Sequence, residues 1–378
     1  MKNLSFIGLD VHKKNIVMGE SLEPGDSQIV GEYPNTDSGI KKLLNKLNKI
    51  SKEYKLRICY EAGPCGYALK RILEDVGYNC DIVAPSLIPV VSGNKIKTDK
   101  RDAMKLARLF RAGELTFIEV PDEEKESVRD LVRCRDDIMT DLKRVKQRLN
   151  HFLIRHGFNY PRTNWTKEHL KWIQQLELSD MNLQNVLSCY MNEIEYLDIQ
   201  LSELDQEIEE IANRDEYKEK VKALCAYRGI GVLTAMIIIS EVIDFSRFSN
   251  ARELMAYLGM VPREYSSGSH IKKGSITKCG NKRVRRVLIE AAHHYRHKPV
   301  INANMKKKLE NTKAPLRVPP VKALKRLNKK YYQMIYRGKK SQTTVVAVGR
   351  ELIGFIWHSM VLIEKELRGT ENQNDNVA

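Results

Sequence analysis

The sequence predicts an α/β domain at the amino terminus, followed by a helical coiled-coil region and a mainly α-helical carboxy-terminal domain. Three observations predict this order. Short apolar runs alternate with amphipathic helical segments up to about residue 120, two stretches with heptad spacing lie between 121 and 220, and helical periodicity returns from 221. We therefore expect domains over 1–120, 121–220 and 221–368, and a polar, disordered tail over 369–378.

The first domain is predicted to contain three strands, a helix, a strand, a helix, a strand and a helix. The predicted strands are 4–9, 15–22, 28–34, 55–61 and 78–85, and the predicted helices are 37–50, 66–77 and one that opens near 99. The turn EPGDS joins two early strands, so these should be antiparallel. The later strands are joined through helices, which predicts mixed pairing in one sheet.

The middle region carries two heptad patterns. The first comprises Val128, Leu131, Ile138, Leu142, Val145, Leu149 and Phe152, with Arg135 as its one polar position. The second comprises Ile194, Leu197, Leu201, Leu204, Ile208 and Ile211. Such spacing favours a coiled coil, and with it a homo-oligomer, either a dimer or a tetramer. Two amphipathic helices packed within one chain would show the same pattern.

Positive charge is concentrated toward the carboxyl end. The net charge is +16, and residues 221–378 carry 30 basic against 11 acidic side chains. Between residues 263 and 340 the chain has 23 basic and three acidic residues. A field of this density favours a polyanionic partner such as nucleic acid.

A membrane or secreted location is not predicted. The longest apolar stretch, 342–364, is interrupted by Arg350 and Glu351, and the amino terminus lacks the features of a signal peptide. The seven cysteines are scattered, with no CxxC motif, which is typical of reduced thiols in a cytoplasm. We therefore expect a cytoplasmic protein without a membrane partner.

Four acids stand at positions where α/β proteins gather reactive groups. Asp10 ends the first predicted strand, Glu61 ends the fourth, and Asp99 and Asp102 open a helix soon after the fifth. Two divalent cations would relieve the repulsion among them, and oxygen ligands favour Mg²⁺ or Mn²⁺ over zinc. Taken singly, each acid also fits a helix cap or a surface charge, with Asp99 as the cap.

Three stretches carry a family resemblance: FIGLDVHKKNI, CYEAGPCGYAL and KTDKRDAMKLARLF. They resemble the DEDD transposases of bacterial insertion sequences, of the one-ten type, which are related to the Piv invertase. The resemblance implies a RuvC-like, RNase H-like fold for the first domain, and its four letters fall in order on Asp10, Glu61, Asp99 and Asp102. It continues through residues 229–292, which are similar to the family's carboxy-terminal transposase domain, so it covers most of the chain.

The segment VPREYSSGSHIKKGSITKCGNKRVRR combines four serines with dense positive charge. Its composition predicts a phosphate-binding loop that leads into a basic helix. The resemblance further implies a catalytic serine in YSSG, matched best by Ser267 with Ser266 as the alternative. This serine would be activated by the metals and form a covalent link to DNA. The nucleic-acid contacts expected from the basic residues are Lys97, Arg101, Arg263, Lys272, Lys273, Lys278, Arg283, Arg285 and Arg286.

The resemblance implies a bacterial DNA recombinase that acts in transposition, composite sites built across protomers, and a bridge RNA that guides the choice of DNA. The acids and the serine could meet within one chain or across a dimer. Three other classes stay open. A nuclease of the Holliday-junction resolvase type needs the acids but no serine. An actin-like kinase needs a second Gly-rich phosphate turn, which the sequence lacks, and a non-catalytic nucleic-acid-binding protein would follow if the acids are caps.

Overall fold

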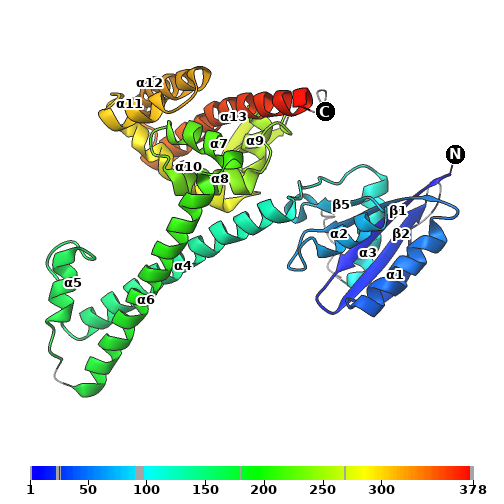
Figure 1. Cartoon of the computed structure of the whole chain (residues 1–378), viewed down its shortest axis with the longest axis horizontal. Coiled ribbons are helices and arrows are strands. Elements are labelled where there is room, and N and C mark those ends of the chain that lie inside the picture. Colours follow the sequence, from blue (N-terminus) through cyan, green and yellow to red (C-terminus); the bar gives the residue numbers. More distant parts are fainter. Residues whose placement is uncertain are drawn as a thin grey trace. The chain divides into compact units, whose positions relative to one another are not determined.

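The protein, described here by a computed structural model, divides into two compact units, residues 1–121 and 122–378 (Figure 1). The structure describes residues 2–22, 25, 27–89, 98–178, 180–267 and 270–374, apart from the side chains of 266, 267, 270–273 and 369–374. The first unit is an α/β domain and the second is mainly helical, which confirms the two classes of structure expected for the two ends of the chain.

The first unit is built on a five-stranded sheet of order β3-β2-β1-β4-β5. Its strands are β1 (Leu4–Val11), β2 (Asn15–Leu22), β3 (Ser27–Pro34), β4 (Lys55–Glu61) and β5 (Cys80–Val83). Strands β1, β2 and β3 pair antiparallel, whereas β4 pairs parallel with both β1 and β5. Its helices are α1 (Asp37–Ile50), α2 (Ala68–Asp75) and α3 (Asp99–Arg111). The predicted order of strands and helices is confirmed.

Different helices cover the two faces of this sheet. Helices α1 and α2 pack over Ile7 and Ile58, whereas α3 packs over Phe6 and Cys59. Neighbouring residues of a strand point to opposite faces, so residues 6, 8 and 10 of β1 all face α3.

Helix α3 crosses β1 and β2 at a pair of glycines. Gly8 pairs with Gly19 across the two strands. A Cβ atom at Gly8 would lie 2.5 Å from the backbone nitrogen of Ala107, and one at Gly19 would lie 2.7 Å from the carbonyl carbon of Ala103. Glycine on the strands and alanine on the helix therefore permit this close approach, which sets where the first turn of α3 lies relative to the end of β1.

The second unit contains long helices and a short hairpin. Its helices are α4 (Glu123–Arg155), α5 (Lys167–Gln174), α6 (Met181–Ala212), α7 (Asp215–Cys225), α8 (Val232–Val242), α9 (Ala251–Tyr257), α10 (Lys282–His293), α11 (Ala303–Glu310), α12 (Ala314–Tyr336) and α13 (Ser341–Asn374). The hairpin is formed by β6 (Pro262–Ser267) and β7 (His270–Ile276). The sequence pattern does not predict this hairpin, because the stability of paired strands comes from cross-strand contacts more than from local periodicity.

Most heptad positions are buried or partly buried where α4 packs against α6 of the same chain, and the others join the core shared with α7 and α8. Leu149 of α4 and Ile194 of α6 belong to one apolar cluster. The polar heptad position, Arg135, donates to both carboxylate oxygens of Asp205, at 2.6 and 3.1 Å. Two amphipathic helices packed within one chain therefore account for the pattern, and self-association through these helices stays a prediction.

Helix α13 lies in the apolar core of the second unit. Val348, Leu352 and Ile356 are buried in a cluster that also contains residues of α7, α10 and α12. By length and composition its segment Ser341–Arg368 could span a membrane, but its apolar face is covered by neighbouring helices, as in a core helix. The helix continues to Asn374, into the segment expected to be disordered, because polar residues without proline can extend a helix that needs no buried face there. Residues 375–378 lie outside the described part.

Candidate active site

Two of the four predicted acids lie next to each other at the carboxyl ends of β1 and β4. The parallel register of these strands pairs Leu9 with Tyr60, so the next residues along are Asp10 and Glu61. Residues in register on parallel neighbours lie about 4.8 Å apart and point to the same face. That face is the one covered by α3, and the Asp10 side chain is only 14% exposed there.

The other two acids lie in the first turn of α3. Thr98 is the N-cap of this helix, because its hydroxyl accepts a hydrogen bond from the amide of Arg101 at 3.4 Å. The alternative in which Asp99 serves as the cap is therefore wrong. Asp99 and Asp102 are the two acidic residues of the first turn, where the helix dipole favours negative charge. Their spacing of three residues places them on neighbouring positions of the helix surface.

A histidine that the sequence analysis did not select joins the acids. The Nε2 atom of His12 lies 3.3 Å from Oδ2 of Asp10 and 3.8 Å from Oδ1 of Asp99. One ligand atom from each of these three residues lies within 4.8 Å of the other two. Glu61 and Asp102 are not part of this closest group. The available signal for His12 was its position two residues after Asp10.

The neighbouring charges alter the ionisation of Asp10. Burial raises the pKa of Asp10 above its ordinary value of 3.8, and the negative charges of Asp99 and Asp102 raise this pKa further, whereas His12 lowers it. Asp102 is therefore close enough to act on Asp10 electrostatically. A bound divalent cation would remove this repulsion, and carboxylate oxygens with one imidazole nitrogen are ligands suited to Mn²⁺ and, through the oxygens, to Mg²⁺. The residues present thus fit a divalent cation.

The predicted serine lies on the hairpin of the second unit. Ser267 is the last residue of β6 and pairs with His270 of β7, and Ser266 pairs with Ile271. Their side chains lie outside the described part. Ser275, farther along β7, is exposed.

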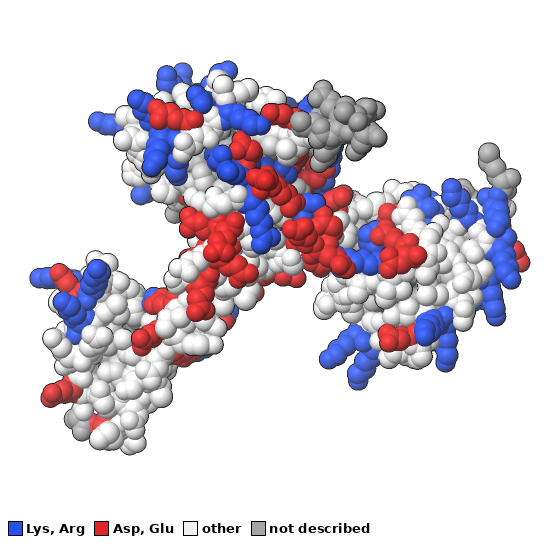
Figure 2. Space-filling view, in the orientation of Figure 1, with Lys and Arg blue, Asp and Glu red and all other residues white. Residues whose placement is uncertain are grey.

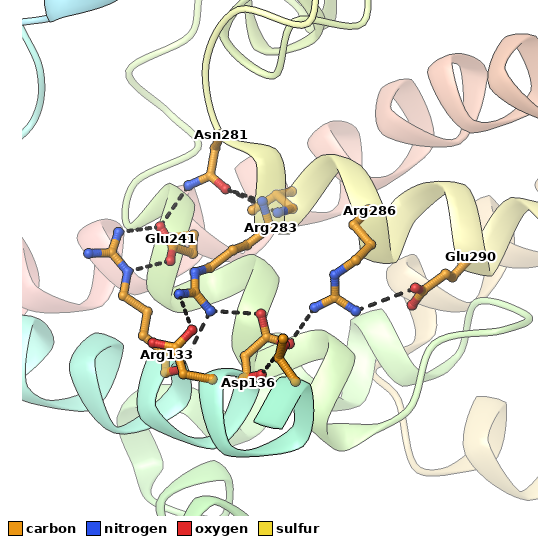
Figure 3. Close-up of polar contacts among 10 residues, drawn as sticks. Arg133, Asp136, Glu241, Asn281, Arg283, Arg286 and Glu290 are labelled. Atoms are coloured by element: carbon orange, nitrogen blue, oxygen red, sulfur yellow. Dashed lines mark hydrogen bonds and ion pairs between the residues drawn. The ribbon is translucent and has the colours of Figure 1, made fainter. Parts of the chain in front are cut away.

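The three arginines at the start of α10 contact other residues of the second unit, and Figure 3 shows Arg283 and Arg286 among them. Arg283 and Arg286 both form ion pairs with Asp136 of α4, at 2.7 and 2.6 Å. Arg285 donates to the carbonyl oxygen of Leu258 at 2.8 Å. Their predicted role in phosphate binding stays a prediction, and for Arg283 and Arg286 it requires these ion pairs to open.

A buried carboxylate lies beside these arginines (Figure 3). Glu241 of α8 accepts hydrogen bonds from Arg133 at 2.6 and 2.7 Å and from Asn281 at 2.6 Å. Burial opposes its ionisation, but these donors outweigh burial and lower the pKa of Glu241 below its ordinary value. Asn281 also caps α10 by accepting from the amides of Arg283 and Val284. Glu241 therefore joins α4, α8 and the start of α10.

The other predicted nucleic-acid contacts fall into two groups. The exposed residues are Arg101, Arg263 and Lys278. Outside the described part are Lys97 and the side chains of Lys272 and Lys273.

An α/β unit with carboxylates clustered at its strand ends, in a chain with a strongly basic helical region, is typical of enzymes that process nucleic acids. Comparison with known families identifies the member of this class. Residues 7–157 match the DEDD transposase model of the IS110 group, and residues 221–306 match the model described as Transposase IS116/IS110/IS902 family. The chain belongs to the IS110 family of transposases.

Individual relatives support the same assignment. A Sinorhizobium fredii protein named as a candidate transposase, y4qE, is 40% identical over 97% of this chain and 90% of its own length. The transposase for insertion sequence element IS1533 of Leptospira borgpetersenii is 37% identical over 78% of this chain and 86% of its own length. The family is one of DNA-cutting enzymes, and the DEDD match supports the RNase H-like fold expected for the first unit.

Proposed function

We propose that the protein is a DNA recombinase that moves an insertion sequence by cutting and rejoining DNA through a serine nucleophile. The observation that carries the proposal is the cluster of Asp10, His12 and Asp99, which lies where the carboxyl end of β1 meets the first turn of α3, within the part of the chain matched by the DEDD transposase model. In this proposal Asp10, Glu61, Asp99 and Asp102 hold Mg²⁺ or Mn²⁺. When bound, such a cation stabilises negative charge that develops on a phosphate.

The serine supplies the covalent step. The Oγ atom of Ser267 forms a bond to a DNA phosphorus, one bridging phosphorus–oxygen bond breaks, and the released DNA hydroxyl takes up a proton. The serine hydroxyl gives up its proton in the same step, so the charges balance. The basic residues around Asp99 and in the second unit hold the phosphate backbone during this reaction. A guide RNA and a homo-oligomeric assembly belong to the proposal through the family resemblance.

A nuclease of the Holliday-junction resolvase type is the competing function, because it would use the same acids. Support for the recombinase comes from the second family match, which covers residues 221–306 and includes the YSSG segment. The two functions differ in one observable product, since only the serine reaction leaves protein covalently attached to DNA.

The metal part of the proposal is tested with Asp10→Asn and Asp99→Asn on DNA that carries the element's ends. We expect either variant to lose at least about 100-fold in cleavage rate, because a lost metal ligand removes several kcal/mol of transition-state stabilisation. DNA binding should be retained. Asp75→Asn is the matched control, since Asp75 is an exposed acid of α2 outside the cluster. Full cleavage in EDTA, or by Asp10→Asn, would overturn the metal assignment.

A further inference from the structure

The exposed face of α12 carries two lysines followed by two solvent-exposed tyrosines. Lys325, Lys329, Tyr332 and Tyr336 succeed one another at spacings of four, three and four residues, which places them along one helix face. All four are exposed, Tyr332 by 40% and Tyr336 by 84%. These four residues form the tyrosine stripe. Tyr336 leaves most of its ring in solvent, so packing within the unit does not explain an aromatic residue at this position.

The two rings of the stripe are neighbours with similar orientation. Their centroids lie 6.1 Å apart and their planes are inclined by 32°. The hydroxyl of Tyr332 donates to the carbonyl oxygen of Arg296 at 2.8 Å, which holds this ring in place. Asn328 donates to the carbonyl oxygen of His297 at 2.9 Å and so fixes the same segment to α12. A ligand that stacks on Tyr332 therefore meets a ring that is already ordered, which lowers the entropic cost of binding.

The surroundings of the stripe are strongly positive. Residues 296–340 contain fifteen lysines and arginines and a single acid, Glu310. Figure 2 shows Lys and Arg side chains gathered over α11 and α12. Among the residues that the structure describes, no ion pair involves Lys325, Lys329 or the exposed cations after the stripe, Arg337, Lys339 and Lys340. These side chains are therefore available to bind an anion.

We propose that the tyrosine stripe is a stacking platform for unpaired bases of single-stranded DNA. Bases stack on exposed aromatic rings only when they are unpaired, and nearby cations then bind the phosphates between them. Duplex DNA would use the cations alone, and an apolar protein surface would leave the cations without partners. We favour DNA over RNA as the single strand because the family acts on DNA. The two strands of DNA separate where strands are exchanged. This inference goes beyond the proposed function, since it involves neither the acids nor Ser267.

The test measures binding of a fluorescein-labelled twelve-residue oligo(dT) to the full-length protein by fluorescence anisotropy. We expect Tyr336→Ala to weaken binding about 10-fold, the loss typical of one stacked base, and Tyr336→Phe to bind within about twofold of the wild type, because stacking needs the ring and not the hydroxyl. Tyr196→Ala is the matched control, since Tyr196 is a 60% exposed tyrosine of α6 away from the stripe. Both positions are exposed, so folding should be unaffected, and thermal unfolding verifies this.

Further measurements distinguish stacking of single-stranded DNA from binding of duplex DNA or of RNA. The assay contains EDTA, so failure of metal-dependent cleavage cannot imitate failure of binding. Binding of a twelve-base-pair duplex should be the same for Tyr336→Ala and the wild type. Oligo(dT) binding that is unchanged in Tyr336→Ala, or reduced equally in Tyr336→Phe, would overturn the stacking role. An oligo(U) RNA that binds at least tenfold tighter than oligo(dT), through the same tyrosine, would overturn the assignment to DNA in favour of RNA.

Discussion

Both burial and neighbouring charges change the pKa of Asp10. It lies at the carboxyl end of β1, with its side chain largely buried, and three charged neighbours act on its ionisation. Asp99 and Asp102 stabilise the protonated form of Asp10 because they are negative, whereas His12 stabilises the ionised form through its positive charge when protonated. A bound cation would offset the repulsion that raises the pKa of Asp10.

The opposite signs of these neighbours give a prediction for the metal-free protein. His12→Ala should raise the pKa of Asp10 further, because it removes the group that favours the carboxylate. Asp102→Asn should lower the same pKa, because it removes a negative charge. The carboxyl ¹³C shift of Asp10, followed by NMR as a function of pH in EDTA, measures both changes. Asp75→Asn should leave the titration unchanged, and shifts of the same sign in the first two variants would contradict the cluster.

Among single residues, the sequence predicted the acids of the site but not the residues that contact them, and not the ion pairs of the basic residues. Asp10 and Glu61 follow from the rule that reactive groups lie at strand ends, and the structure places them on neighbouring strands. His12 gave a weaker signal, because its position two residues after Asp10 was the one feature that distinguished it from other histidines. The ion pairs of Arg283 and Arg286 were equally hidden, since their partner Asp136 lies about 150 residues away in the sequence.

The position of α3 depends on small residues where it crosses β1 and β2. Gly8→Ala should displace this helix, because the added Cβ would lie 2.5 and 2.6 Å from backbone atoms of Ala107 and Ala103. We expect a loss of about 1–3 kcal/mol in unfolding free energy from this overpacking. Mn²⁺ binding should weaken as well, since Asp99 and Asp102 move with the helix.

The control for this variant is Gly63→Ala. Among the described residues, a Cβ at Gly63 would meet only the carbonyl oxygen of Glu61, at 3.8 Å, so it fits there without movement although it lies near the same strand end. Thermal unfolding and Mn²⁺ titration followed by electron paramagnetic resonance measure the two effects. Wild-type Mn²⁺ affinity in Gly8→Ala would show that the position of α3 does not control the site.

The contact between α4, α8 and α10 depends on the buried carboxylate of Glu241. Its pKa is lower in the folded protein than the ordinary 4.5, so its contribution to stability is present above that value and is lost as the pH falls through the folded-state pKa. Glu241→Gln should reduce the unfolding free energy by about 1–3 kcal/mol at pH 7, because a neutral amide replaces the carboxylate that accepts charge-assisted hydrogen bonds from Arg133. The difference from the wild type should narrow as the pH falls below the ordinary 4.5 toward the lowered folded-state pKa.

Urea denaturation of both proteins at pH 7 and at low pH tests this prediction. Glu290→Gln serves as the control, because Glu290 pairs with Arg286 at 3.4 Å on the surface and is 61% exposed. A Glu241→Gln variant as stable as the wild type at pH 7, or a difference that does not change with pH, would contradict the role given to this carboxylate.

Periodicity predicted the elements of the first unit better than those of the second. Apolar strands and the amphipathic segment at 37–50 have strong local signals, and α1 has the bounds expected from the sequence. The hairpin of β6 and β7 is short and polar, so no apolar pattern marked it. The sequence also left open what packs on the two heptad helices. Heptad spacing shows that one face of a helix is buried, but it does not show whether the same chain or another chain covers that face.

For the whole molecule, the distribution of charge and the family membership both indicate a nucleic acid as the substrate. The net charge of +16 is concentrated after residue 220, and the chain belongs to a family of transposases. Helices α4 and α6 pack against each other within one chain, and the formation of an oligomer stays a prediction. The cleavage product distinguishes the two candidate functions, because only a serine recombinase forms a covalent protein–DNA adduct.

The most direct test of the central claim is to locate the protein–DNA bond. Wild-type protein is incubated with Mg²⁺ and DNA that carries the element's ends, denatured, and digested, and the DNA-modified peptide is identified by mass spectrometry. Our account predicts an adduct on Ser267 that is absent from Ser267→Ala, from Asp10→Asn and from reactions in EDTA. A link at Ser266, at Ser275 or at a tyrosine would contradict the assignment of the nucleophile, and metal-dependent cleavage without any adduct would contradict the serine mechanism in favour of a resolvase-type nuclease.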